Sequence, residues 1–390
     1  MLSSVAISEH LDTRTAAMEV AELLQDAVHD SVDVVLVFGS FHHRESFAEA
    51  VADIRRTLSP EIIIGMTVES VVGCDLELEG VAGLSAIAMQ LPGIILTPWT
   101  TTPKKPLPIS KPDEIPAWLG LNSDTKGTLF FADPFSTPIT RLLPALAQLQ
   151  PTPISVIGGM VSGASQAGFN RLILNDQLIH SGGIGLTMSG QIDIDCIVSQ
   201  GCRPIGEPLR ITKIEHNVVL ELGGKPALDT LRDLANGISP KERELLKGGV
   251  LLGGVIEENK DYFGRGDFLV RTILGIDQKR KGIAVGEFYR LGKTVQFHVR
   301  DAQTAVEDLQ QLLDVQELSD QPFAGLLVTC NSRGRSLFHE EDCDLTIIRN
   351  RIGEVPVAGF FAAGEIGPIG GTSFLHGHTS CLTLFRGSLN

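Results

Sequence analysis

Three stretches of this 390-residue chain repeat one order of elements, and this repetition constrains the fold more than any other feature. Each stretch has an apolar strand, a polar loop, usually a helix, a second strand that runs into glycines, and a third strand. The first strands lie in DVVLVFGS (33–40), GTLFFADPFS (127–136) and AGLLVTCNSRGR (324–335). Strands that alternate with helices indicate layered α/β units. We therefore predict an α/β (α+β) fold of repeated β-α-β-β units, which form mixed sheets covered by helices and make two pseudo-symmetric halves.

Apolar spacing places a helix after the first strand of copies one and two. In copy one, the apolar positions at helical spacing are Phe47, Ala50, Val51, Ile54 and Leu58. In copy two, Thr137 is the expected cap and Pro138 the first helical residue. Its apolar face is expected to consist of Leu142, Leu143, Leu146 and Leu149. The interval before copy three could hold a fourth, divergent copy, with a helix at 228–235 and strands at 249–257, 268–276 and 283–285.

Other segments interrupt or follow this pattern. Residues 98–116 are rich in Pro, Thr and Lys, which predicts a linker or surface loop. Residues 192–225 are expected to be extended, with a turn at GCRPIGEP. Asp301 is expected to cap a helix over 302–313. We place two domains at residues 1–220 and 221–390.

The balance of charge excludes some partners. The chain has 47 acidic and 32 basic side chains and a net charge of −15. An acidic surface repels phosphate backbones and anionic lipid, so we expect neither nucleic acid nor a membrane as a partner. The N-terminal residues MLSSVAISEHLD lack the basic and apolar regions of a secretory signal, and no apolar stretch approaches the ~20 residues of a membrane span. We therefore expect a cytoplasmic protein.

Familiar catalytic signatures are missing from the sequence. It contains no nucleotide-binding fingerprint, no G-x-S-x-G and no H-E-x-x-H. The six cysteines have no C-x-x-C spacing, which disfavours a zinc ribbon or a redox motif. The pairs His42–His43 and His376–His378 lack a nearby third ligand. We therefore expect a binding protein rather than an enzyme, with no catalytic residue and no metal site.

Two glycine-rich segments supply the first candidate ligand-binding residues. In GGMVSG (158–163), Gly158, Gly159 and Ser162 either surround an anion with backbone amides or form a tight turn. In GCRPIG (201–206), Cys202 and Arg203 stand in a loop that a proline makes rigid. There the guanidinium either binds an anion or joins a salt bridge.

Two later segments supply the remaining candidates. In TCNSRGR (329–335), Cys330 is either a reactive thiol or a small buried side chain, and Arg333 and Arg335 are expected to face one cavity from an extended chain. In GEIGPIGGTSFLHGHT (364–379), Glu365 follows an apolar strand, so it is either capped by amides or faces a cavity, with His376 as the nearest natural partner.

We expect all four segments to converge at one site, with Arg203 and Glu365 close together across the domain boundary. The arginines would hold a ligand carboxylate and Glu365 its amine. Alternatively, Glu365 is itself the anion beside the arginines, in a structural ion pair.

Together these stretches resemble the FIST family, named for F-box and intracellular signal transduction proteins. The N-terminal likeness rests on VVLVFGS, IIIGMTVESVVG, LFFADP and VIGGMVSG, although Met66 stands where the family usually has cysteine and Glu69 and Ser70 also depart from its pattern. The C-terminal likeness rests on VSQGCRPIGEP, residues 225–227, FLVRTILGID, VQFHVRDAQTAVEDL, TCNSRGR and the segment 364–379. The resemblance covers nearly the whole chain.

This resemblance implies a sensory domain that binds a small molecule such as an amino acid and signals through a separate partner. Two alternatives stay open. Because some bacterial members of the family bind haem and report nitric oxide, the chain could bind haem through His376 or another histidine. It could also be a thiol-dependent or hydrolytic enzyme that uses Cys330 or Cys202.

Overall fold

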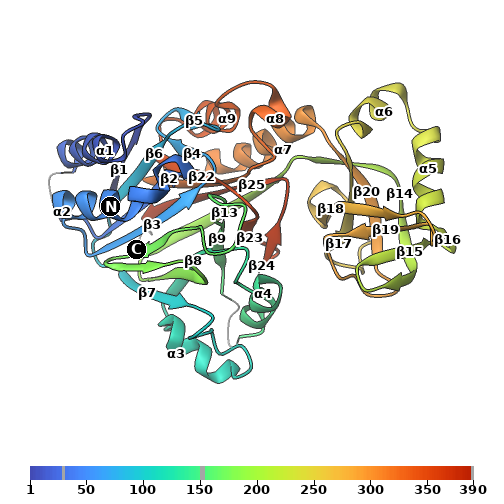
Figure 1. The fold of residues 1–390 in the computed structure, drawn as a ribbon, viewed down its shortest axis with the longest axis horizontal. Coiled ribbons are helices and arrows are strands. Elements are labelled where there is room, and N and C mark those ends of the chain that lie inside the picture. Colours follow the sequence, from blue (N-terminus) through green and yellow to red (C-terminus); the bar gives the residue numbers. More distant parts are fainter. Residues whose placement is uncertain (29–30, 150–153, 388–390) are drawn as a thin grey trace. The chain divides into compact units, whose positions relative to one another are not determined.

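A computed structural model of the chain describes residues 1–28, 31–149 and 154–387 (Figure 1). The chain divides into two compact units. Unit 1 comprises Met1–Val198, Gln310–Leu375 and Thr379–Asn390, and unit 2 comprises Ser199–Leu309 and His376–His378. The expected boundary at 220/221 falls inside unit 2, within strand β15 (Val218–Leu222).

Unit 1 contains the three repeats that the sequence predicts. In each repeat two parallel strands flank a helix, and a third strand runs antiparallel beside the first. Repeat 1 consists of β2 (Val34–Ser40), α2 (Phe47–Leu58), β3 (Ile62–Val68) and β6 (Leu84–Gln90). Repeat 2 consists of β8 (Thr125–Ala132), α4 (Ile139–Ala147), β9 (Val156–Met160) and β12 (Gly183–Ser189). Repeat 3 consists of β21 (Ala324–Cys330), α9 (Cys343–Ile352), β22 (Val357–Ala362) and β25 (Thr379–Gly387).

Between its second and third long strands, each repeat sends out a hairpin that joins a different repeat. The hairpins are β4–β5 (Val71–Gly73 and Leu76–Leu78), β10–β11 (Leu172–Leu174 and Gln177–Ile179) and β23–β24 (Glu365–Ile369 and Thr372–His376). The hairpin of repeat 1 extends the sheet of repeat 3, that of repeat 3 extends repeat 2, and that of repeat 2 extends repeat 1. This exchange closes a ring, so no repeat completes its own sheet.

The ring has an aromatic centre. Phe38, Phe131 and Phe360 come one from each repeat, and their ring centroids lie 5.5 to 6.5 Å apart. All three are fully buried. Aromatic pairs at these separations contribute packing energy beyond their buried area. The middle of unit 1 is therefore solid core, and polar groups gather instead where the strands end.

Other elements of unit 1 cover or extend the three sheets. Helices α1 and α2 pack together beside the first sheet, as Figure 1 shows. The bounds of these elements are β1 (Leu2–Ser8), α1 (Thr13–Ala27), β7 (Ile95–Thr101), α3 (Ile115–Leu119) and α8 (Arg335–Phe338). Two further elements, β13 (Ile192–Gln200) and α7 (Ala302–Asp314), are divided between the two units, at residues 198/199 and 309/310. The predicted helix over 302–313 is confirmed. Thr137 does not cap α4, because its hydroxyl donates to the Gly182 carbonyl instead (3.0 Å).

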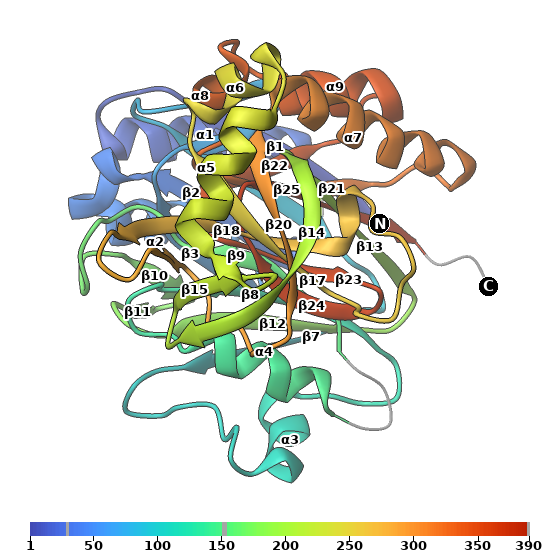
Figure 2. The ribbon, with the colours of Figure 1, turned by 90° about the vertical axis from the view of Figure 1, so that its right-hand side faces the viewer.

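Unit 2 is a small closed barrel. Its strands pair in the order β14-β20-β17-β18-β19-β15, and β15 pairs with β14 to close the ring. The bounds are β14 (Cys202–Glu215), β16 (Lys225–Pro226), β17 (Val250–Val255), β18 (Phe268–Asp277), β19 (Gly282–Val285) and β20 (Thr294–Arg300), with helices α5 (Ala227–Gly237) and α6 (Pro240–Leu246). Figure 2 shows α5 beside β14 and β15. The segments proposed as a fourth copy belong to this barrel, so that expectation is wrong.

The fold class of repeated β-α-β-β units in mixed sheets with covering helices is confirmed. The three repeats share unit 1, while unit 2 has another architecture, so the structure replaces the expected pair of matching halves with one ring of three repeats and an inserted barrel.

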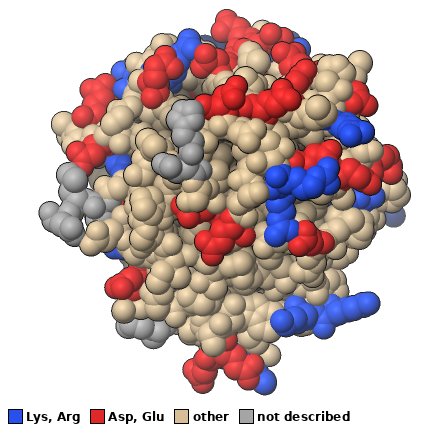
Figure 3. Space-filling view, turned by 90° about the vertical axis from the view of Figure 1, so that its left-hand side faces the viewer, with Lys and Arg blue, Asp and Glu red and all other residues tan. Residues whose placement is uncertain are grey.

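Two surface properties complete the fold. No helix within the described residues is long and apolar enough to cross a membrane. On the face drawn in Figure 3, Asp and Glu side chains gather in several groups with Lys and Arg side chains between them, in keeping with the net charge of −15.

Candidate functional site

The first strands of the three repeats end in polar or thiol residues at matching positions. Ser40 ends β2, Asp133 directly follows β8, and Cys330 ends β21. All three are buried. The amides of Ser40 and Asp133 donate to the equivalent carbonyls of Gly83 and Gly182, at 2.8 and 2.7 Å. Because the carboxyl ends of parallel strands meet at one edge of a sheet, polar groups of each repeat gather at these edges.

Beyond the buried layer, one residue from each repeat meets at a single point. The Glu69 amide of repeat 1 donates to Ser162 Oγ of repeat 2 (2.9 Å), and Asn331 Nδ2 of repeat 3 donates to Glu69 Oε2 (2.9 Å). Glu69 and Asn331 are exposed and Ser162 is half-buried. We call these three residues, with the buried Cys330 and Glu365 beneath them, the strand-end site.

Glu365 is fully buried at the first position of β23. Its Oε2 accepts hydrogen bonds from the amide and the hydroxyl of Thr379, at 3.2 and 2.6 Å. Burial raises the pKa of this carboxyl to about 8, against the lowering effect of the Thr379 hydrogen bonds and of the nearby Cys330 and Arg333. Glu365 is therefore mostly protonated at neutral pH, and a neutral carboxyl beneath the surface is a poor partner for a ligand amine.

Arg333 is held by Asp344 in a buried ion pair. Its Nε and Nη2 donate to the two oxygens of Asp344, at 2.8 and 3.0 Å, and both side chains are 1% exposed. Thr329 Oγ1 donates to the same carboxylate (3.1 Å). This geometry is the bidentate arginine–carboxylate pair, which fixes both side chains.

Arg335 does not accompany Arg333, so the expectation that both guanidiniums face one cavity is wrong. The Arg335 side chain is 46% exposed and pairs with Glu341 (3.1 Å), while its Nη2 donates to the Glu79 carbonyl (2.7 Å). The physical reason is Gly334, whose φ of 56° turns the chain into α8. Alternation of side chains applies only to an extended chain.

The glycines of GGMVSG serve close packing within a sheet. Gly158 has a φ of 139°, and a Cβ there would lie 2.2 Å from the Phe130 carbonyl oxygen. Gly158 and Gly159 pair with β8 on one side and β23 on the other, so this segment continues the ladder into which Glu365 pairs. The strand pairing accounts for these glycines without an anion nest.

The remaining predicted residues, Cys202, Arg203 and His376, belong to unit 2. Cys202 is buried at the start of β14. Arg203 pairs with Glu242 (3.6 Å) and Asp301 (3.9 Å). The segment expected as a rigid loop is a strand, because Cys202 to Ile205 pair in register with β20. His376 is buried at the end of β24. The structure thus brings Gly159, Ser162, Cys330, Arg333 and Glu365 together in unit 1.

Sequence reasoning missed a second buried acid beside the Arg333–Asp344 pair. Glu77 is 5% exposed in the hairpin of repeat 1, and its Oε1 accepts the Leu345 amide (2.8 Å). Burial and the neighbouring Asp344 raise the pKa of Glu77 to about 8. Glu69 and Asn331 were also missed as candidates. The one signal in the sequence was the departure from the family pattern at Glu69.

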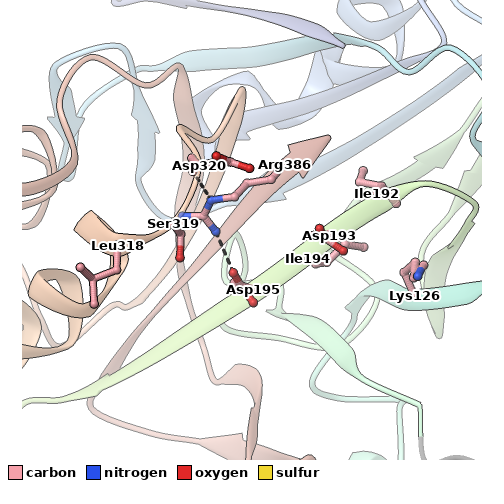
Figure 4. A pocket seen from close by; sticks show the side chains of 9 residues that line it. All are labelled: Lys126, Ile192, Asp193, Ile194, Asp195, Leu318, Ser319, Asp320 and Arg386. Atoms are coloured by element: carbon pink, nitrogen blue, oxygen red, sulfur yellow. Dashed lines mark hydrogen bonds and ion pairs between the residues drawn. The ribbon is translucent and has the colours of Figure 1, made fainter. Parts of the chain in front are cut away.

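A separate hollow of about 580 Å³ lies on unit 1 beside β13 (Figure 4). Arg386 reaches across it and donates to Asp195 (2.7 Å), Gln316 (2.9 Å) and the Asp320 carbonyl (2.5 Å). The guanidinium thus ties three segments of the chain together. We interpret these Arg386 contacts as structural, and the hollow beside them as no ligand site.

The described part of the chain contains neither a cluster of metal ligands nor a disulfide. No group of three or more His, Cys, Asp or Glu residues among residues 1–28, 31–149 and 154–387 could hold a metal ion. All six cysteines lie within these ranges and none forms a disulfide, and Cys330 Sγ lies 3.1 Å from Ser332 Oγ.

The fold and site define an α+β protein with three cyclically linked repeats, an inserted barrel and a polar strand-end site. The FIST N domain matches residues 33–225, and the FIST C domain matches residues 227–368. This chain belongs to the FIST family, as its motifs predicted, and FIST domains are sensory domains.

The chain is similar to uncharacterised mycobacterial proteins over its whole length. An uncharacterised protein of Mycobacterium tuberculosis is 35% identical over 391 residues, which cover 99% of this chain and 100% of the relative. One of Mycobacterium bovis is 32% identical over 405 residues, 99% of each chain. A crystal structure of cyanuric acid hydrolase from A. caulinodans aligns over 100% of this chain and 99% of that chain, with a TM-score of 0.37 and 7% identity. That likeness is too weak to support an inference.

Proposed function

We propose that this protein is a sensor of a small amine-bearing molecule, such as an amino acid, and that it binds this ligand at the strand-end site and signals through a separate partner. The observation that carries the proposal is the meeting of Glu69, Ser162 and Asn331, one from each repeat, at an exposed point. A ligand there contacts all three repeats at once.

Glu69 is the group that would hold the ligand amine. Its Oε2 accepts a neutral amide N–H from Asn331 (2.9 Å), and the carboxylate is exposed. Ionised partners strengthen a hydrogen bond, and an ammonium adds Coulomb attraction to the carboxylate that the neutral Asn331 amide lacks. A ligand ammonium therefore competes well for this position and releases the Asn331 side chain.

The release of Asn331 gives the site a way to signal. Asn331 directly follows Cys330, and its own amide donates to the Ala362 carbonyl (3.0 Å). A displacement of the Asn331 side chain therefore shifts the ends of both parallel strands of repeat 3, β21 and β22. The segment after Asn331 leads through Arg333 into α8, whose first residue, Arg335, is exposed. A signalling partner can bind the surface around Arg335.

The test is a thermal-shift screen of the common amino acids and small amines, followed by calorimetry on any that bind. A ligand present at about 100 times its Kd stabilises the folded protein by about 2.7 kcal/mol, so its Tm rises measurably. Glu69→Gln removes the charge and is expected to weaken binding by about 1.5–3 kcal/mol, roughly 10- to 150-fold in Kd.

The matched control is Glu61→Gln, which removes an exposed carboxylate just before the other end of the same strand, β3. Binding that survives Glu69→Gln, or that falls equally in both variants, contradicts the proposed site. Visible absorption after addition of haemin tests the haem alternative, because a bound haem gives a Soret band that the strand-end proposal does not require.

A further inference from the structure

The segment 98–116, expected to be a linker or surface loop, runs from the end of β7 into a loop that walls a cavity in repeat 2. After β7, residues 102–110 fold back, with mutual hydrogen bonds between the backbones of Thr102 and Lys105 (2.9 and 3.1 Å). The Leu107 amide donates to Thr101 Oγ1 (3.0 Å), and Leu107 is 5% exposed. These hydrogen bonds fix the conformation of the segment, which forms one wall of the cavity.

This cavity has a volume of about 360 Å³, within the range of roughly 300–1,000 Å³ that small-molecule sites occupy. Its rim is open to solvent, because Pro103, Pro106, Ser110 and Pro138 are exposed, so a small molecule can enter it. Its apolar walls are Pro103, Pro106, Leu107, Ile109, Pro138 and Leu142.

The polar groups of the cavity are all uncharged. They are the hydroxyls of Thr101, Thr102, Ser110, Ser136 and Thr137, and no Asp, Glu, Lys, Arg or His of the described residues lines it. A charge buried there without a partner would be costly. The occupant is therefore neutral.

Two of these hydroxyls define what the occupant offers. Thr101 Oγ1 accepts the Leu107 amide, and Thr102 Oγ1 accepts the Lys105 amide (3.1 Å). Within the described residues neither hydroxyl is seen to donate a hydrogen bond. Each hydroxyl carries one donor besides its acceptor capacity, so both can donate to an oxygen of a ligand. By contrast, Ser136 donates to Asp133 and accepts the Gly182 amide (2.8 Å), so it is already occupied.

We propose that this cavity is a second ligand site, independent of the strand-end site, for a small, mainly apolar, neutral molecule that carries a carbonyl or ether oxygen. The apolar body packs against the prolines and leucines, and the oxygen accepts from Thr101 or Thr102. The site lies wholly within unit 1.

The fluorescence of the chain's own tryptophans can report ligand binding at this site. Its two tryptophans are Trp99 and Trp118, and both belong to the hydrophobic cluster around α3 and α4. Lys105 of the closing segment lies 4.8 Å from the centre of the Trp118 ring. Leu107, Ile109 and Leu142 of the cavity wall belong to the same cluster. A ligand that contacts them therefore changes tryptophan emission, and a fluorescent ligand receives energy from it.

The experiment titrates the full chain with PRODAN, a neutral naphthyl ketone whose emission shifts to the blue when it leaves water. We expect one bound probe per chain, with quenching of tryptophan emission. Ile109→Trp fills the cavity and is expected to weaken binding about tenfold or more. Ala52→Trp, on the exposed face of α2, adds the same side chain elsewhere and should leave binding within about twofold.

A conservative variant tests the hydrogen bond. Thr102→Val keeps the shape of the side chain but removes the hydroxyl, so it should weaken PRODAN binding several-fold while circular dichroism shows an unchanged fold. Ser110→Phe, at the exposed rim, replaces Ile109→Trp if that variant does not fold. The proposal is overturned if the probe stays unbound, or if it binds equally well to the cavity-filling and the α2 variants.

Discussion

Arg333 and Asp344 form a bidentate ion pair, with Nε and Nη2 at 2.8 and 3.0 Å from the two carboxylate oxygens and each side chain 1% exposed. The pair joins the end of β21 to the start of α9. Glu77, from the hairpin of repeat 1, lies against the same carboxylate and accepts the Leu345 amide. One buried cluster thus links two repeats beneath the strand-end site.

The first prediction concerns this pair. Arg333→Ala leaves a buried carboxylate without its partner and should lower the free energy of unfolding by about 3–5 kcal/mol, measured by urea denaturation. Arg335→Ala is the matched control, because it removes an exposed ion pair worth about 0–1 kcal/mol. Equal losses in the two variants would contradict the structural role of Arg333.

The second prediction concerns the pH dependence of stability. The pKa of Glu365 rises from 4.5 to about 8 on folding, so the folded state binds a proton more tightly than the unfolded state. Its contribution to stability is full below about pH 4.5 and is lost as the pH rises through about 8. Glu365→Gln keeps the neutral form, so stability should fall less between pH 6 and 9 in the variant.

Glu77 titrates in the same direction, so Glu365→Gln should reduce this pH dependence without abolishing it, and Glu77→Gln should reduce it further. The measurement is the free energy of unfolding of each variant across this pH range. A steeper loss of stability with rising pH in Glu365→Gln than in the parent protein would contradict the assignment.

The third prediction concerns close packing in β9. Gly158→Ala places a Cβ against the Phe130 carbonyl and imposes an unfavourable φ of 139°, so it should cost at least the ~1–3 kcal/mol typical of a strained backbone position. Gly168→Ala is the control, because Gly168 also has a positive φ but nothing lies within 4 Å of the position that its new methyl group would take. Comparable thermal shifts in the two variants would speak against the clash.

The fourth prediction concerns the thiols. Mild alkylation of the folded protein should label the exposed Cys74 well before the buried Cys202, Cys330 and Cys381, as peptide mass spectrometry would show. Faster labelling of Cys330 than of Cys74 would instead favour the thiol-enzyme alternative.

The repeats were predictable from the sequence because their long strands are apolar over five or more residues and recur with the same neighbours. The exchange of hairpins was not, because strands such as β4 and β10 have three residues each, too few for any periodicity, and they pair with distant parts of the chain. The pairing is decided by tertiary packing rather than by local pattern.

The site was predictable in part for similar reasons. Cys330 ends β21 and Glu365 comes three residues after the adjacent parallel strand β22, so their closeness follows from the order of elements. Asp344 looked like an ordinary helical acid, and only the fold places it against Arg333. Glu69 and Asn331 are exposed polar residues after strands, and apart from the departure from the family pattern at Glu69 they look like other loop residues.

The most direct test of the proposed function is native mass spectrometry of the protein as purified, beside its Glu69→Gln variant. We predict that the parent protein carries a small amine-bearing molecule, released on denaturation and identified by its mass, and that Glu69→Gln loses it while Glu61→Gln keeps it. The same molecule on all three proteins, or a bound molecule without an amine, would contradict ligand binding through Glu69.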